Sequence, residues 1–266
     1  KFIIPLQDPA GSRSDLLVVR DIASPGGSIT AFTVTDKERS VLEAEMEQLL
    51  NNCAGERVHS HSLVANAPSF IEGASVVTQT VRSMAVRPNV MFFAVGQDEK
   101  RDDLLKHLFR VAVNEKLGVV MLARHPQAAF GLQNTIRVWL HEGSPDWDLD
   151  NTPQNWHLAM LAAIRLADKW NSSIEVVTAV RSEEDVLPGS QFLAEVGERA
   201  RLPNCSEFTL EVSSFSEVLK TVNHVDLNIF GIGPQPNFDF FRDTVHKTSS
   251  SCLFVKDSGK ESAIDD

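Results

Sequence analysis

The sequence predicts an α/β fold built from two tandem domains, each with a five-stranded, mainly parallel sheet flanked by helices. Short apolar runs alternate with amphipathic helical patterns along the chain, as is typical of this class. The order also repeats, because Val119 of the fifth run lies 117 residues after Phe2 of the first, and Cys252 lies 116 residues after Ile136. Buried runs joined through helices form parallel sheets with right-handed crossovers.

The first half contains five apolar runs and four helical patterns. A Pro-Gly-Gly turn at 25–27 ends the first helix. Thr35 or Asp36 is suited to cap the second helix, and Pro68 is suited to the first turn of the third. The strands are expected at 2–6, 28–34, 58–65, 89–95 and 118–123, and the helices at 12–23, 36–52, 68–84 and 100–116.

The second half repeats this order after a junction near 126–133. A polar loop rich in Pro and Asp, 142–153, follows its first strand, and Pro188-Gly189 predicts a break in its second helix. The strands are expected at 135–140, 173–179, 207–212, 227–231 and 251–256, and the helices at 155–170, 182–199, 215–222 and 238–248. We therefore expect domains over 1–127 and 134–257, with a flexible tail over 258–266.

Composition excludes several classes of function. The net charge of −11 argues against nucleic acid and against direct anchoring on an anionic lipid surface. No run of about 18 apolar residues exists to span a membrane. Cys53, Cys205 and Cys252 are odd in number and far apart, which favours reduced thiols in the cytosol. Because the chain enters a strand directly after Lys1, we expect it to be a fragment of a larger protein.

Two loops resemble the first loop of universal stress proteins, a family of Rossmann-like domains. They follow the first and sixth strands, at Gln7–Ser12 and His141–Ser144, where an acidic residue and Gly-Ser precede a helix. That family holds ATP with a later Gly-x2-Gly-x9-Gly-Ser/Thr motif, whose backbone approaches the phosphates closely. The motif is absent after Gly96 and after Gly233, and Pro234 also removes an amide. We therefore expect no nucleotide site in either half.

No other pattern predicts chemistry, so we expect no catalytic residue, no cofactor and no metal. Gly-x-Gly-x-x-Gly, Gly-x-Ser-x-Gly and Walker motifs are absent. His59 and His61 could share a metal, but no third ligand lies near them in sequence, which favours a solvent-facing pair on an edge strand. Four tryptophans are expected either to pack in the second core or to form an interface, and the core is favoured: Trp139, Trp147, Trp156 and Trp170.

Four stretches resemble the cytoplasmic C-terminal domain of the cation-chloride cotransporters, in the same order and spacing as in that family. The family signature is a Thr-Ile-Asp-Val-Trp-Trp-Leu strand before a His-Asp-Gly-Gly turn. Here Arg137 stands for Asp, Trp139 stands alone, and the loop over Asp146–Asp150 is longer and acidic, which indicates a distant, prokaryotic member. The matching stretches are Pro88–Gly96, Gly118–Arg124, Thr135–Gly143 and Ser173–Val180.

The resemblance implies a homodimeric regulatory domain with two universal-stress-like halves, on the cytoplasmic side of the membrane. It follows the transmembrane domain of a protein that carries chloride with sodium or potassium. Control by phosphorylation is not implied, because the regulatory insertions of animal relatives have no match. The alternative is a tandem universal-stress-like nucleotide-binding protein. A weaker alternative is an enzyme whose site includes Asp146, Asp148 and Asp150.

Overall fold

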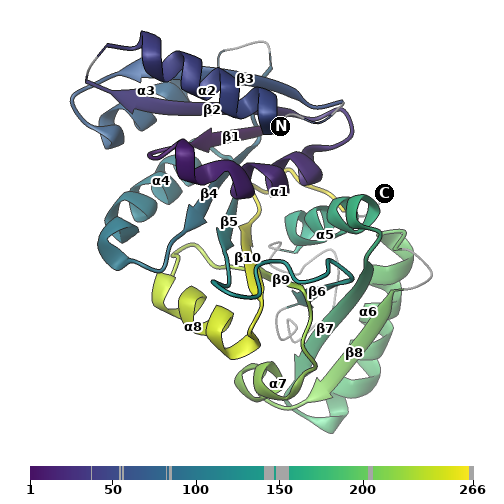
Figure 1. The fold of residues 1–266 in the computed structure, drawn as a ribbon. Coiled ribbons are helices and arrows are strands. Elements are labelled where there is room, and N and C mark those ends of the chain that lie inside the picture. The colour runs from purple at the N-terminus through teal and green to yellow at the C-terminus, as the bar shows by residue number, and fades with distance from the viewer. Residues whose placement is uncertain are drawn as a thin grey trace. The chain divides into compact units, whose positions relative to one another are not determined.

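The computed structural model divides the chain into two compact units, Lys1–Leu122 and Ala123–Asp266. Within the described residues, each unit carries five strands and four α-helices in alternation (Figure 1). This confirms the predicted α/β class with two tandem halves. The structure describes residues 1–36, 38–53, 55, 57–81, 83, 86–140, 147, 156–202 and 206–263.

Unit 1 has the strand order β3-β2-β1-β4-β5. Strand β1 pairs in parallel with both β2 and β4, and β2 pairs in parallel with β3. The chain therefore leaves β1 in one direction and returns on its other side at β4, as in doubly wound sheets. The elements are β1 (Phe2–Pro5), α1 (Arg13–Ala23), β2 (Ser28–Thr35), α2 (Ser40–Cys53), β3 (His59–Asn66), α3 (Phe70–Val81), β4 (Val90–Val95), α4 (Asp102–Asn114) and β5 (Gly118–Ala123).

Unit 2 has the equivalent order, β10-β9-β6-β7-β8, and all four of its strand pairs are parallel. Strand β6 takes the place of β1, and β9 the place of β4. The identical topology confirms the repeat that the strand spacing predicts. The elements are β6 (Thr135–Leu140), α5 (His157–Trp170), β7 (Ser173–Val180), α6 (Val186–Arg199), β8 (Glu207–Val212), α7 (Phe215–Thr221), β9 (Leu227–Gly231), α8 (Phe238–Thr248) and β10 (Ser251–Lys256).

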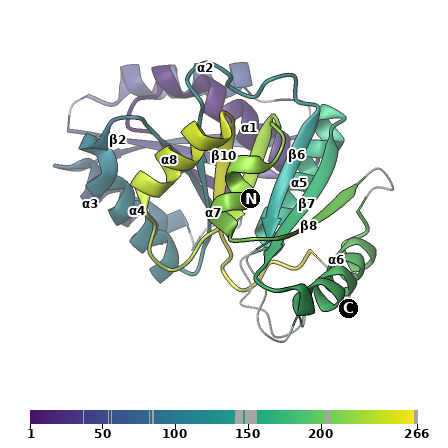
Figure 2. The same cartoon turned by 90° about the horizontal axis from the view of Figure 1, so that it is seen from below.

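Helices cover both faces of each sheet. In unit 1, α1 packs beside α2 and α3 beside α4, and in unit 2 α7 packs beside α8. Figure 2 shows α6 and α7 on opposite sides of β7 and β8. The central strands are buried on both faces, as their continuous apolar runs predict. In β1 and β6, only Thr135 is exposed, and that only in part.

Three helix predictions are wrong in detail. Helix α3 begins at Phe70, so Pro68 lies outside it rather than in its first turn, and the Ser69 hydroxyl accepts from the Glu72 N–H at 3.3 Å. Helix α2 begins at Ser40, not at Asp36, because β2 continues to Thr35 to pair with the end of β3. Neither Thr35 nor Asp36 therefore caps that helix. Helix α6 is not broken at Pro188, since it begins at Val186 and places this proline in its first turn, where the lost amide has no helical partner.

The segment that follows β5 packs on unit 2. The carboxylate of Asp226 accepts hydrogen bonds from the backbone N–H groups of Leu132, Asn134 and Thr135, at 3.0, 2.7 and 3.1 Å. The backbone N–H of His125 also donates to the Ser251 hydroxyl at 3.0 Å. These bonds explain why the compact unit begins at Ala123 rather than at β6.

Candidate functional site

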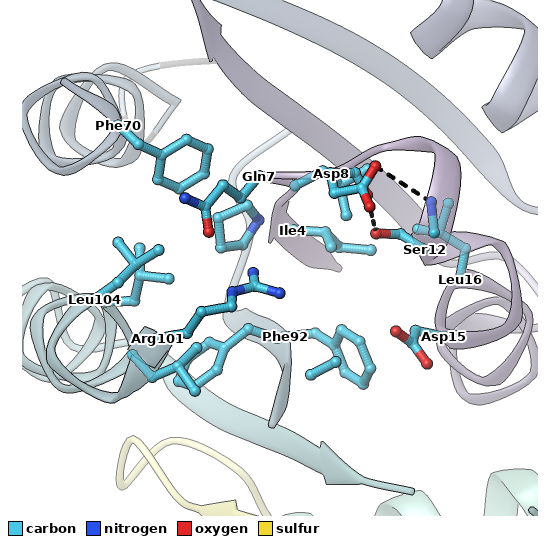
Figure 3. Close-up of a pocket in the computed structure, with 17 residues that line it drawn as sticks. Ile4, Gln7, Asp8, Ser12, Asp15, Leu16, Phe70, Phe92, Arg101 and Leu104 are labelled. Atoms are coloured by element: carbon cyan, nitrogen blue, oxygen red, sulfur yellow. Dashed lines mark hydrogen bonds between the residues drawn. The ribbon is translucent and has the colours of Figure 1, made fainter. Parts of the chain in front are cut away.

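A cavity of about 120 Å³ lies in unit 1 where the carboxyl ends of β1 and β4 diverge. This is the place where doubly wound sheets bind ligands. Figure 3 shows the guanidinium of Arg101 pointing into it, with Asp8 and Asp15 on the other side. Phe70 and Phe92 contribute apolar surface. The cavity thus combines one cation, two carboxylates and aromatic rings.

The chain's own carboxylates accept hydrogen bonds from the backbone amides of the loops at this end of the sheet. After β1, the Gly11 N–H donates to Asp8 Oδ1 at 3.4 Å, and the Ser12 hydroxyl donates to the Asp8 carbonyl at 2.7 Å (Figure 3). After β4, the Lys100 N–H donates to Asp98 Oδ1 at 2.9 Å. Phosphate binding at a helix start requires free amides. Both loops therefore present carboxylates where a phosphate would need donors.

Size and charge also disfavour a nucleotide in this cavity. Pockets for drug-sized ligands occupy roughly 300–1,000 Å³. Two carboxylates face a single exposed guanidinium here, so the local charge opposes a polyphosphate. The site is suited to water or a small polar group.

Unit 2 has stacked aromatic rings at the equivalent strand positions. Register places Phe2 beside Val90 in unit 1 and Ile136 beside Leu227 in unit 2, so Trp139 stands where Pro5 stands in the first half. The indole is 3% exposed and stacks on Phe230 at 5.5 Å between centroids. Trp139 therefore places a large, buried ring at the position that corresponds to Pro5 in the lining of the unit 1 cavity.

A buried ion pair lies beside this indole. Arg137 and Glu175 are neighbours in the β6–β7 register, and their side chains are 2% and 16% exposed. Arg137 donates to Glu175 Oε2 from Nε at 2.9 Å and from Nη2 at 2.8 Å, and its Nη1 donates to the Asn223 carbonyl at 2.8 Å. The guanidinium carbon also lies 5.7 Å from the Trp139 ring centroid. The Arg137 guanidinium is thus contacted by Glu175, by the Asn223 carbonyl and by the Trp139 ring.

The other tryptophans of the predicted cluster lie in different surroundings. Trp156 is 5% exposed and stacks on the His157 imidazole at 4.2 Å. Trp147 is half-buried against Phe192, and Trp170 is half-buried against Phe130. The core interpretation is confirmed for Trp139 and Trp156.

A buried carboxylate, Asp257, lies at the N-terminal end of α5. It is 4% exposed and accepts the backbone N–H groups of His157 and Leu158, both at 3.1 Å. Burial raises its pKa to about 7, although these two amides and Lys256 oppose the shift. Burial also lowers the pKa of the His157 imidazole, against the influence of Glu261. Sequence patterns did not indicate this pair, because their contact joins residues 100 positions apart.

The remaining predicted candidates do not assemble into a site. His59 and His61 are exposed on β3, which is an edge strand of unit 1. Within the part of the chain that the structure describes, no three His, Cys, Asp or Glu side chains gather as a metal would require. Cys53 and Cys252 are buried free thiols whose pKa burial raises, in Cys252 to about 12. Cys205, the His141–Ser144 turn and the aspartates of the 142–153 loop lie outside the described residues.

Comparisons with known proteins identify the two halves separately. Residues 4–130 match the family described as the prokaryotic cation-chloride cotransporter C-terminal domain, 1st, and residues 131–264 match its 2nd counterpart. No curated protein matches the chain by sequence. Among the helices that the structure describes, none is both long and apolar enough to cross a membrane.

Solved structures agree with these matches. The chain is similar to the cytoplasmic domain of a prokaryotic cation chloride cotransporter, with 26% identity and a TM-score of 0.86, over 99% of this chain and 97% of that one. A protein of unknown function from Pseudomonas aeruginosa PAO1 has 12% identity and a TM-score of 0.57, over 97% and 93%. A universal stress protein from Archaeoglobus fulgidus DSM 4304 has 9% identity and a TM-score of 0.51, over 96% of both chains. The last two support the fold alone.

Proposed function

This chain belongs to the family of C-terminal domains of prokaryotic cation-chloride cotransporters, and on that premise we propose that it is a cytoplasmic regulatory and dimerisation domain. The full protein would carry chloride together with sodium or potassium by secondary active transport. The chain itself would catalyse no reaction. Its partners would be a second copy and the transmembrane domain of the same protein. Chloride uptake into vesicles that contain the full protein, measured once with sodium and once with potassium, shows which cation is coupled to chloride.

One observation carries the proposal beyond family membership. In unit 1, Asp8 and Asp98 accept the loop amides and leave a cavity of only about 120 Å³, and in unit 2 the buried Trp139 stands at the equivalent strand position. The fold alone does not assign a function, so the small size of the unit 1 cavity directs attention to the outer surfaces. Contact with other protein surfaces is therefore the role that the geometry favours.

Dimerisation is tested by multi-angle light scattering over a dilution series. We expect a mass near twice 29.4 kDa that falls toward 29.4 kDa on dilution, because a homodimer dissociates by mass action. A mass of 29.4 kDa throughout would contradict the dimer.

Nucleotide binding is the second candidate, because the unit 1 cavity lies at the carboxyl ends of β1 and β4, where this fold holds ligands, although its size and charge oppose a nucleotide. We expect isothermal calorimetry with ATP to give no binding heat, because Asp8 and Asp98 hold the loop amides and Asp15 adds negative charge. The Asp8→Asn variant is the matched comparison for the parent chain. It removes one negative charge from the cavity and keeps a side-chain oxygen that can accept the Gly11 N–H. Saturable binding by the parent chain, lost in Arg101→Gln, would establish this function instead.

A further inference from the structure

The cavity of unit 1 carries opposite charges on facing walls. Figure 3 shows the Arg101 guanidinium on one side and the carboxylates of Asp8 and Asp15 on the other. Among the described residues, the Arg101 side chain forms no ion pair and no hydrogen bond, and the residue is exposed to solvent. The guanidinium and the carboxylates are therefore held apart across a space that a dissolved molecule can reach.

Apolar side chains line the space between these charges. Phe70, Phe92 and Leu104 contribute to the wall. The Phe70 ring stacks on the buried ring of Phe32 at 6.3 Å between centroids, which fixes its position. The cavity measures about 120 Å³, whereas pockets for drug-sized ligands occupy roughly 300–1,000 Å³. A ligand for this cavity must therefore be compact and have only a short apolar part.

A ligand with a single charge would be poorly matched to these walls. A lone anion would face the two carboxylates, and a lone cation would leave the guanidinium without a partner. A molecule with both a carboxylate and an ammonium group meets an opposite charge at each end. The planar guanidinium can donate two parallel hydrogen bonds to a carboxylate, and an ammonium has three donors for carboxylate oxygens. The wall charges thus favour a zwitterion.

We propose that the unit 1 cavity binds a small amino acid in its zwitterionic form. The ligand carboxylate pairs with Arg101, and the ligand ammonium pairs with Asp15 and with Asp8 Oδ2, the oxygen that does not accept the Gly11 N–H. The apolar wall leaves room for a hydrogen or a methyl group on Cα and excludes longer side chains. The bound molecule connects the first turn of α1, which contains Asp15, to the residue directly before α4, Arg101.

An amide NMR titration of the whole chain with glycine and with alanine tests the site. We expect saturable shifts of the amides of Gly11, Ser12 and Arg101, with a Kd on the order of 1 mM, because a ligand with few atoms has a limited binding free energy. Acetate and methylammonium carry only one of the two charges and should bind at least about tenfold more weakly. Leucine should also bind more weakly, because its side chain would meet the fixed Phe70 ring.

Three variants locate the binding to this cavity. Arg101→Gln and Asp15→Asn each remove one charge from the lining and should weaken glycine binding at least about tenfold. Arg110→Gln is the matched control, because it removes an exposed arginine from α4 that lies outside the lining, and it should bind glycine as the parent does. The thermal unfolding midpoint of each variant shows whether it is folded, and the comparison of ligands on the parent chain needs no variant.

Three results would overturn the proposal. The first is the absence of saturable shifts at the three amides with glycine or alanine up to about 100 mM, roughly a hundredfold above the expected Kd. The second is equal affinity for glycine and acetate, which would indicate a simple ionic effect. The third is unchanged glycine binding by the folded Arg101→Gln variant.

Discussion

Replacing Glu175 with alanine is expected to destabilise unit 2 by about 3–5 kcal/mol, because Arg137 would stay buried without its counter-charge. Arg137 is 2% exposed, and two of its three side-chain hydrogen bonds go to the Glu175 carboxylate. The Thr209 hydroxyl, which donates to Glu175 Oε1 at 3.3 Å, would lose its acceptor as well. A buried charge that loses its partner costs far more than a surface pair does.

Denaturant unfolding followed by tryptophan fluorescence measures this effect in unit 2 alone, because all four tryptophans lie between Trp139 and Trp170. The double variant Arg137→Met, Glu175→Leu should recover most of the lost stability, since an apolar pair of similar volume leaves no buried charge. Glu195→Ala breaks an exposed pair with Arg199 and should cost less than about 0.5 kcal/mol. A double variant as unstable as Glu175→Ala would contradict the ion-pair explanation.

This pair also shows which part of the site the sequence could predict. Arg137 is recognisable from sequence as a departure from the family signature, whereas no motif singles out Glu175. The β6–β7 register shows that the two residues form a single contact. Periodicity predicts each strand separately but does not set which residues of two strands lie side by side, so the pair could not be predicted from sequence.

Elsewhere, local patterns predicted which elements form. They failed where contacts between distant parts of the chain set the bounds of an element or the burial of a side chain. Burial and helical periodicity are local properties, so β6, β8, β9, α8 and β10 have the expected bounds. The start of α2 depends instead on how far β2 pairs with β3, and capping preferences at Asp36 do not report that. The Asp257 carboxylate similarly lies directly before the predicted tail, and its burial follows from contact with α5, which the local sequence does not report.

The second large effect is expected at the indole that closes the unit 2 crevice. Trp139→Ala should lower the free energy of unfolding of unit 2 by about 3–5 kcal/mol, as for other large-to-small core substitutions. The change removes the stack on Phe230 and the edge contact with Phe215, whose ring centroid lies 5.4 Å away. It also removes the hydrogen bond that Trp139 Nε1 donates to Asn228 Oδ1 at 2.9 Å.

Two further variants separate ring packing from hydrogen bonding. Trp139→Phe keeps an aromatic ring but leaves the fully buried Asn228 without its donor, so a loss of about 1–3 kcal/mol is expected. Trp170→Ala, at a half-buried ring, should cost less than either because it leaves a smaller void. The remaining tryptophans still report unfolding in each variant. If Trp139→Ala unfolds at the parent's denaturant midpoint, the indole does not support the core, and the crevice of unit 2 would have to be kept closed by other groups.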